Sequence, residues 1–214
     1  MTEFFGPPAD PGHDRDDGRF AGVAIGLVTN NRDPDGFGRV KVTLPWLADD
    51  AETDWARVAV PMAGAGRGFT FLPEVGDEVL VAFEHGNPEV PYVVGALWNG
   101  KDRPPVTNAD GRNDTRAITS RSGHVVRLVD TDGDERIEIV DGSAANSIVI
   151  STRDDRVTIT AGADIVISAG GRLRLSGNGV EIDSGDGVSV RAESALTATS
   201  GGQLDIKGRQ VNIN

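Results

Sequence analysis

Apolar residues return in pairs along the last third of the chain. From position 148 onward, two apolar residues separated by one other residue recur about every eight residues, with segments such as Ala-Gly-Gly, Gly-Asn-Gly and Ser-Gly-Asp-Gly between them. Side chains at i and i+2 of an extended strand share a face, so each unit predicts one short strand followed by a tight turn. The strands together predict a narrow ribbon with one apolar stripe, formed by Ile148, Ile150, Val157, Ile159, Ile165, Ile167, Leu173, Leu175, Val180, Ile182, Val188, Val190, Leu196, Leu204 and Ile206.

One copy of this ribbon provides only one wall, and its stripe needs a cover. Identical copies related by cyclic symmetry bring the same stripe to a common axis. Three walls close a triangular prism filled by Val, Ile and Leu, whereas two leave free strand edges and four leave a void. We therefore expect an intertwined trimeric β-helix or β-prism. Its outward positions are polar as this arrangement requires, among them Arg153, Arg172, Arg174, Glu181, Asp183, Arg191 and Lys207.

The first half of the chain has a different pattern. Five apolar-rich segments separated by turn-forming residues predict five strands, at 21–29, 38–46, 55–62, 77–86 and 90–98. Five strands in this length favour a small closed barrel of the OB type. The expected fold class is all-β, with an OB-type barrel followed by a repetitive needle.

The same pattern predicts the domain boundaries. We expect a flexible arm at 1–18, an OB-fold domain at 19–100, a linker at 101–117 and a β-helical spike at 118–214. Just inside the spike, the segments HVVRLVD and ERIEIVD flank TDGD, which predicts a β-hairpin.

Charge and composition exclude several classes of partner. The chain has 33 acidic and 21 basic residues, for a formal net charge of −12, which disfavours binding to nucleic acid or to an anionic membrane. It has no cysteine, so disulfides and thiolate metal sites are excluded. The N-terminal segment lacks the basic start and following apolar run that would predict a signal peptide. No run of apolar residues reaches the ~18 needed for a membrane span. We expect assembly in the cytoplasm, followed by export only as part of a larger particle.

No motif predicts catalysis, a cofactor or a bound metal. The segment DTDGDE at 130–135 resembles a calcium loop but lacks the following bidentate Glu, so a hairpin turn is favoured. The segment GAGRG at 64–68 lacks the Lys-Ser/Thr of a phosphate loop and is interpreted as a loop between barrel strands. The histidines His13, His85 and His124 are far apart in sequence and form no evident site.

Three segments resemble a known family. They are GLVTNNRDPDGFGRVKVTLPWL, FLPEVGDEVLVAFEHGNPEVPYVVGALWNG and TSRSGHVVRLVDTDGDERIEIVD. They are similar to the central spike proteins of contractile injection systems, which include phage baseplate assembly protein V, type VI secretion VgrG and the spikes of extracellular tail-like particles. The resemblance extends over roughly residues 20–214.

The resemblance implies a homotrimer with an OB collar and a needle, placed at the centre of a baseplate below the tube. Since only a short arm precedes the barrel, it also implies a separate hub protein. No His-ligated metal tip is expected, and the terminus is expected to dock a PAAR-type tip protein through Val211, Asn212, Ile213 and Asn214. The resemblance also allows effectors as cargo of the spike, and it implies contact with the target membrane only during puncture.

Two other functions are less consistent with the sequence than this structural role. An OB barrel with exposed aromatic residues could bind single-stranded nucleic acid, but the acidic charge opposes it. We expect Trp46, Trp55, Trp98, Phe69, Phe71 and Phe83 to be core residues instead. A glycan-cleaving enzyme of the tail-fibre type would need a pair of carboxylates in a cleft, and no such pair is evident.

Overall fold

A computed structural model describes residue 20 and residues 22–47 and 52–212. Within these ranges the fold is all-β apart from one 3₁₀ turn, η1 at Glu84–Gly86, and no helix is long and apolar enough to cross a membrane. The chain divides into two compact units, residues 1–162 and 163–214. The arm expected at 1–18 lies outside the described residues.

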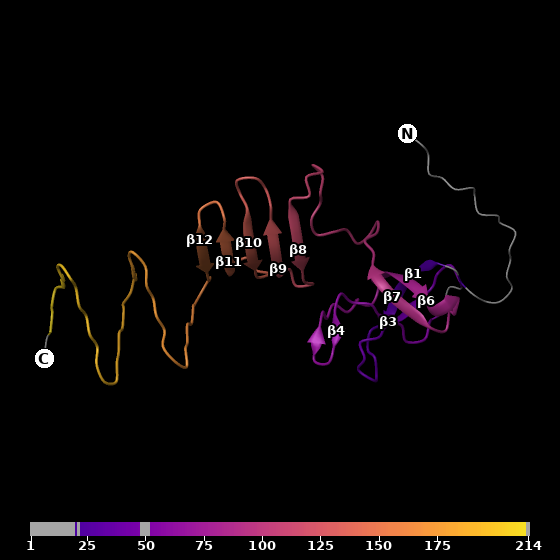
Figure 1. Cartoon of the computed structure of the whole chain (residues 1–214), viewed down its shortest axis with the longest axis horizontal. Helices are drawn as coiled ribbons and strands as arrows, with labels where there is room; N and C mark the ends of the chain where they lie inside the picture. Colours follow the sequence, from indigo (N-terminus) through magenta and orange to yellow (C-terminus); the bar gives the residue numbers. More distant parts are fainter. Residues whose placement is uncertain (1–19, 21, 48–51, 213–214) are drawn as a thin grey trace. The chain divides into compact units, whose positions relative to one another are not determined.

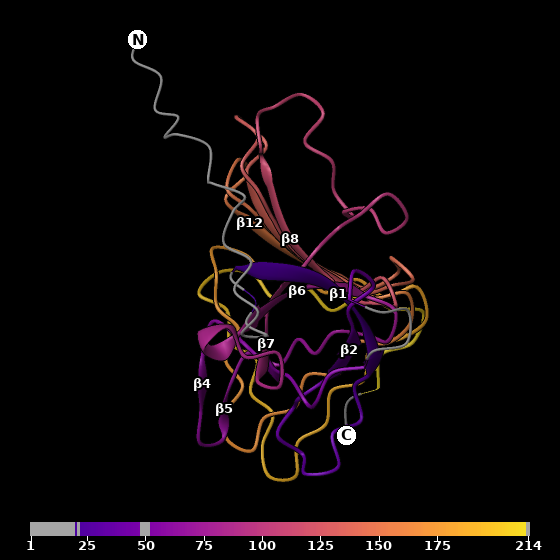
Figure 2. The same cartoon turned by 90° about the vertical axis from the view of Figure 1, so that its right-hand side faces the viewer.

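Five strands of the first unit form one curled sheet. Its order is β2-β1-β6-β7-β3, and every neighbouring pair is antiparallel except the parallel pair β7–β3 (Figures 1 and 2). The all-β class is therefore confirmed, and the curled sheet is consistent with an OB-type barrel. The five strands lie within the five predicted segments or extend one of them by one residue: β1 Val23–Asn30, β2 Lys41–Thr43, β3 Arg57–Val58, β6 Glu78–Phe83 and β7 Pro91–Ala96.

The core of this sheet is built mainly from valine. Alternate residues of β1, β6 and β7 face inward, as the period of a strand requires. Gly26 of β1 faces the carbonyl of Thr43, where a Cβ would lie only 3.0 Å from the carbonyl oxygen, so the close approach of β2 favours glycine there. The buried cluster consists of Val28, Val40, Val42, Leu44, Ala56, Val79, Val81, Phe83 and Val93.

The expectation that the aromatic residues form the core is wrong for most of them. Only Phe83 is buried, and Trp55 is half-buried at the surface, where Arg39 and Lys41 lie over its ring. The physical reason is that small β-branched side chains already fill the interior, while the remaining aromatic residues lie outside the sheet on connecting segments. The exposed ones are Trp46, Phe69, Phe71 and Trp98.

The GAGRG segment lies within a short β-hairpin. It consists of β4 Ala63–Gly64 and β5 Arg67–Gly68, which pair antiparallel around Gly66 at φ +64°. This agrees with the expectation of a connection between barrel strands.

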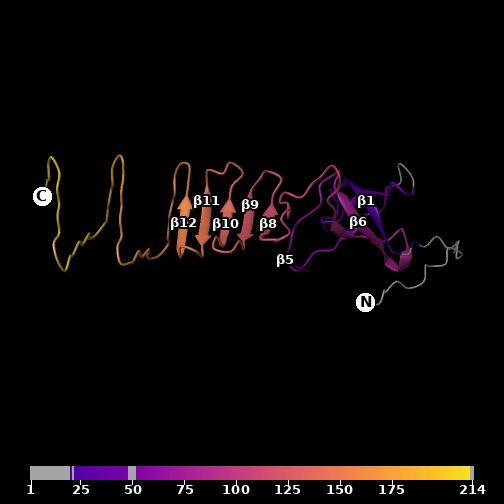
Figure 3. The same cartoon turned by 90° about the horizontal axis from the view of Figure 1, so that it is seen from above.

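The other five strands form an antiparallel meander in the order β12-β11-β10-β9-β8 (Figure 3). The predicted hairpin is confirmed, because β9 and β10 pair around residues 130–135 with Gly133 at φ +74°. β8 begins three residues before the expected start of the spike at position 118. The strands are β8 Thr115–Thr119, β9 Val125–Val129, β10 Arg136–Val140, β11 Ser147–Ser151 and β12 Arg156–Thr160.

In the second unit the backbone bends at a regular interval. Bends lie at 170–171, 177–178, 185–186, 193–194 and 201–202, so the eight-residue period of the sequence is also a structural period. Between bends the chain runs as extended segments that reverse direction (Figures 1 and 3). Within residues 163–212, no two of these segments are paired in a β-ladder.

Serine hydroxyls close two of these turns in the same way. Ser184 Oγ donates to the carbonyl oxygen of Gly187 at 3.0 Å, and Ser200 Oγ donates to that of Gln203 at 3.1 Å. The two serines are two units apart and both bond three residues ahead, as expected of side chains that satisfy turn carbonyls. The repeat is therefore encoded in its turns as well as in its apolar pairs.

Candidate assembly surface

One face of the β8–β12 sheet consists of two ladders of aliphatic side chains. Because the strands are in register, an apolar residue of each strand lies opposite one of the next strand. The exposed fractions of these side chains lie between 39% and 63%, so the described residues leave this face largely uncovered. One ladder is Ile118–Val126–Ile139–Ile148–Ile159, and the other is Leu128–Ile137–Ile150–Val157.

The structure thus brings four predicted stripe residues into two continuous ladders and adds others. Ile148, Ile150, Val157 and Ile159 were expected from the repeat. The apolar residues of the predicted hairpin before them were not assigned to the stripe, because the apolar pairs there are eleven residues apart rather than eight. A search for i, i+2 apolar pairs at any spacing would have found Val126, Leu128, Ile137 and Ile139.

The remaining predicted stripe residues lie in the second unit. Their side chains are exposed by between 54% and 70%. They lie on the extended segments between the bends, at Ile165, Ile167, Leu173, Leu175, Val180, Ile182, Val188, Val190, Leu196, Leu204 and Ile206.

The opposite face of the β8–β12 sheet is mainly polar, although Val125, Val129, Val140 and Val149 also lie on it, and it carries a charge cluster. Glu138 of β10 is only 8% exposed and accepts hydrogen bonds from Arg127 Nε at 2.7 Å and Arg136 Nε at 2.5 Å. Burial alone would raise the pKa of Glu138, but the guanidinium groups of Arg136 and Arg127 outweigh burial and lower that pKa. The sheet therefore has one face of aliphatic ladders and one mainly polar face with a charge cluster, an asymmetry that suits a wall around a shared apolar axis.

The β1–β2 connection is a rigid loop built around Asp33. The Asp33 side chain is 3% exposed, and its carboxylate accepts backbone N–H bonds from Asp35, Phe37 and Arg39, besides the Arg39 guanidinium at 2.7 and 2.9 Å. Gly36 and Gly38, both at φ +71°, flank Phe37 at the apex. The Arg39 guanidinium holds the pKa of Asp33 well below its usual range.

The four residues expected to dock a tip protein are only partly described. Val211 is 49% exposed, and the amide Nε2 of Gln210 donates to Asn212 Oδ1 at 3.0 Å. Ile213 and Asn214 lie outside the described residues.

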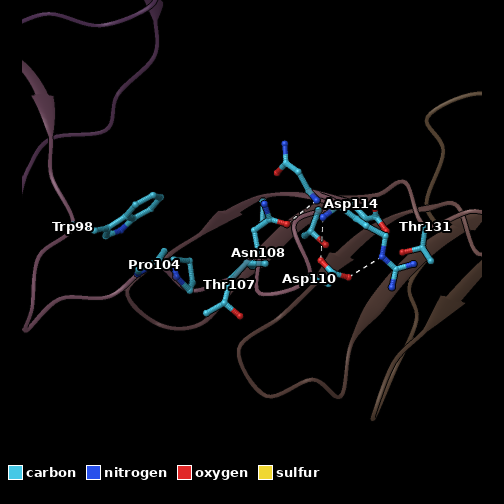
Figure 4. A pocket seen from close by; sticks show the side chains of 13 residues that line it. Trp98, Pro104, Thr107, Asn108, Asp110, Asp114 and Thr131 are labelled. Carbon is cyan, nitrogen blue, oxygen red and sulfur yellow. Dashed lines mark hydrogen bonds and ion pairs between the residues drawn. The ribbon is translucent and has the colours of Figure 1, made fainter.

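A pocket of about 420 Å³ lies along the segment between β7 and β8 (Figure 4). Its polar groups bond one another: Asp110 pairs with Arg112 at 2.9 Å, and Asn108 Oδ1 accepts the backbone N–H of Asn113 at 2.7 Å. Because these groups hold the loop itself, the pocket presents no convergent set of groups for chemistry.

The described residues hold no group of three or more His, Asp or Glu side chains placed to bind a metal ion. His85 lies in η1 at φ +51°, while His124 Nδ1 accepts the backbone N–H of Gly142 at 3.0 Å. His13 lies outside the described ranges. The two described histidines therefore lie in turns.

Acid is expected to destabilise the β8–β12 sheet through Asp141. Bonds from Ser143 Oγ and from the backbone and side chain of Asn146 lower the pKa of Asp141 to about 2. The ordinary pKa of an unfolded Asp is about 3.9, so this group stabilises the fold above about pH 4, and its contribution is lost as the pH falls toward 2. Thermal unfolding between pH 2 and 7 should show a falling midpoint below about pH 4, and Asp141→Asn should reduce that fall. An identical pH profile for Asp141→Asn would contradict this role.

Comparison with known proteins identifies the class of the curled sheet. Residues 24–98 match the family model of the type VI secretion system/phage-baseplate injector OB domain. This range contains all but the first residue of β1 and the whole of β2, β3, β6 and β7.

The chain is also similar to several curated proteins. The type VI secretion system spike protein VgrG5 of Pseudomonas aeruginosa is 33% identical over 144 residues, which are 62% of this chain and 18% of VgrG5. The spike protein VgrG4b of the same organism is 34% identical over 145 residues, with 63% and 18% covered. The actin cross-linking toxin VgrG1 of Vibrio cholerae is 30% identical over 103 residues, with 46% and 9% covered. The resemblance to VgrG-type spike proteins is therefore confirmed, although the chain matches less than a fifth of the length of these relatives.

Proposed function

We propose that this chain is the central spike of a contractile, phage tail-like injection system and that it acts as a homotrimer. The observation that carries the proposal is the exposed aliphatic stripe of the β8–β12 sheet, together with the exposed apolar pairs of the same sequence repeat in the second unit. The injector OB domain at 24–98 and the similarity to VgrG spike proteins support the same role.

Burial of the stripe provides the driving force for assembly. Removing apolar surface from water contributes roughly 25 cal/mol per Å², and a half-exposed row of Ile, Leu and Val side chains has much of that contribution still to gain. The extended segments of 163–212 also have backbone N–H and C=O groups that form no β-ladder with the other described residues. Strands from other copies would pair these groups as well as cover the stripe.

In this proposal, residues 19–100 form the collar, 101–117 the linker and 118–214 the needle. The stripe residues of three copies meet on the needle axis, and the polar positions face outward. Val211 to Asn214 form the platform for a PAAR-type tip protein, a separate hub protein binds above the collar, and effectors can be carried. The role is mechanical: the trimer transmits force to a membrane that it meets only on puncture, with no cofactor and no bound nucleic acid.

Limited trypsin digestion tests the assembled needle. Arg172, Arg174, Arg191, Lys207 and Arg209 are exposed in the single chain, which would be cut at all five positions. Pairing with two other copies would hold the backbone in a ladder and protect it. We expect a resistant fragment that contains residues 172–209. Rapid cleavage at Arg174 and Arg191 in the native protein would contradict an assembled needle.

Quantification of purified tail-like particles tests the role itself. Mass spectrometry with isotope-labelled peptides should find three copies of this chain per particle. The spike role would be contradicted if cells that express the chain produced intact contractile particles that do not contain it.

A further inference from the structure

The chain contains two Asn-Gly pairs, and their asparagine side chains are held very differently. The pairs are Asn99–Gly100 and Asn178–Gly179. Glycine has no Cβ, so its backbone nitrogen approaches the side-chain carbon Cγ of the preceding asparagine with little steric hindrance. An Asn-Gly pair therefore carries the groups for an internal attack on the asparagine amide. The conformation around each asparagine decides whether that attack takes place.

Three hydrogen bonds hold the side chain of Asn99. Its Oδ1 accepts the backbone N–H groups of Lys101 at 2.8 Å and Asp102 at 2.7 Å, and its Nδ2 donates to Glu78 Oε2 at 3.2 Å. The backbone N–H of Asn99 also donates to the carbonyl oxygen of Asp102 at 2.9 Å. Since the side chain has to leave these bonds before the Gly100 nitrogen can reach its Cγ, this turn opposes the attack.

The side chain of Asn178 is exposed in the bend at 177–178 of the second unit. The backbone N–H of Gly179 donates to no backbone carbonyl of the described chain. No heavy atom lies within 4 Å of the place where a Cβ of Gly179 would be, so the space beside this glycine is open. Within residues 163–212, the side chains that form hydrogen bonds are Ser184, Ser200, Gln203, Asp205, Gln210 and Asn212. No contact in this range therefore holds the Asn178 amide away from the Gly179 nitrogen.

We propose that Asn178 is a site of spontaneous deamidation that needs only water as co-reactant. The backbone nitrogen of Gly179 attacks Cγ of Asn178, its proton passes to the side-chain amide nitrogen, and the bond between Cγ and that nitrogen breaks to release ammonia. The product is a five-membered succinimide. Hydrolysis of the new Cγ–N bond gives aspartate, whereas hydrolysis of the original peptide bond gives isoaspartate, in which the chain continues through Cγ.

The reaction changes both the charge and the spacing of the eight-residue repeat. Either product places a carboxylate at position 178, between the apolar pairs Leu173/Leu175 and Val180/Ile182. Isoaspartate also lengthens the backbone by one carbon atom within this turn. The proposal concerns a single chain and does not depend on the trimer.

Peptide mapping of the full-length protein after storage tests the proposal. The native protein is kept in mildly alkaline buffer prepared with heavy-oxygen water, then unfolded and digested with trypsin in ordinary water. Only succinimide hydrolysis during storage introduces heavy oxygen, and fragmentation of the peptide locates the label. Because Asn99 is restrained by three hydrogen bonds, we expect label at position 178 to form at least about ten-fold faster than label at position 99.

Two controls relate this difference to the proposed mechanism. In protein stored in denaturant, positions 99 and 178 should be labelled at similar rates, since only the fold distinguishes the two pairs. In Gly179→Ala, the added Cβ fits the open space but hinders the attacking nitrogen, so label at position 178 should fall sharply. Equal labelling of both positions in the native protein would overturn the proposal. Absence of label at position 178 under conditions that label the unfolded chain, or undiminished label in Gly179→Ala, would also overturn it.

Discussion

Replacing Ile148 with aspartate in the full-length chain is expected to abolish the trimer. Ile148 lies in β11 within the ladder that runs from Ile118 to Ile159, opposite Ile139 and Ile159. In the proposed prism, three copies would bring three carboxylates into an apolar interior. An uncompensated buried charge costs about 3–5 kcal/mol, and mutual repulsion adds to this cost. The assembly constant should fall by well over a factor of a hundred.

The matched control is Thr158→Asp on the neighbouring strand. Thr158 lies between Val157 and Ile159, so its side chain is on the face of the same sheet opposite the aliphatic ladders. This variant adds the same charge but should remain trimeric in light scattering. A trimeric Ile148→Asp protein, or equal loss of assembly in both variants, would contradict a shared apolar axis.

Replacing Val93 with alanine is expected to destabilise the OB domain by about 2–3 kcal/mol. Val93 of β7 is 1% exposed and belongs to the valine cluster of the curled sheet. The substitution removes two buried methyl groups and leaves a cavity in a close-packed core. Denaturant unfolding followed by the fluorescence of Trp46 and Trp55 measures the change in the free energy of unfolding.

The next residue provides the control for this prediction. Val94 is 44% exposed and points to the other face of β7, so Val94→Ala should change the free energy of unfolding by no more than about 0.5 kcal/mol. Equal effects of Val93→Ala and Val94→Ala would mean that this sheet does not have a single buried face.

The sequence was sufficient to predict those elements whose positions follow directly from a local residue pattern. Apolar-rich segments separated by turn-forming residues predicted all five strands of the curled sheet, because each strand contributes side chains to the valine core. The hairpin around Gly133 followed from its turn residues, and the bends of the second unit follow the eight-residue repeat.

The predictions that were wrong or absent concern contacts between residues that a linear sequence pattern does not reveal. Trp98 and Phe71 were expected in the core because the acidic charge opposed a base-stacking surface, but they lie on connecting segments beside a core already filled by valine. The five hydrogen bonds of Asp33 depend on a loop that folds back on one carboxylate, so the conformation of this loop was not predictable. In the proposed trimer, the extended segments of 163–212 would pair with other copies, and a single chain does not contain such contacts.

The absolute mass of the full-length protein in solution, measured by light scattering, tests the central claim most directly. A shared stripe predicts about 67 kDa, three times the 22.5 kDa of one chain, and a species that persists on dilution and in mild denaturant. A well-folded species of 22.5 kDa would show that the chain covers its own stripe, and this result would contradict the trimeric spike.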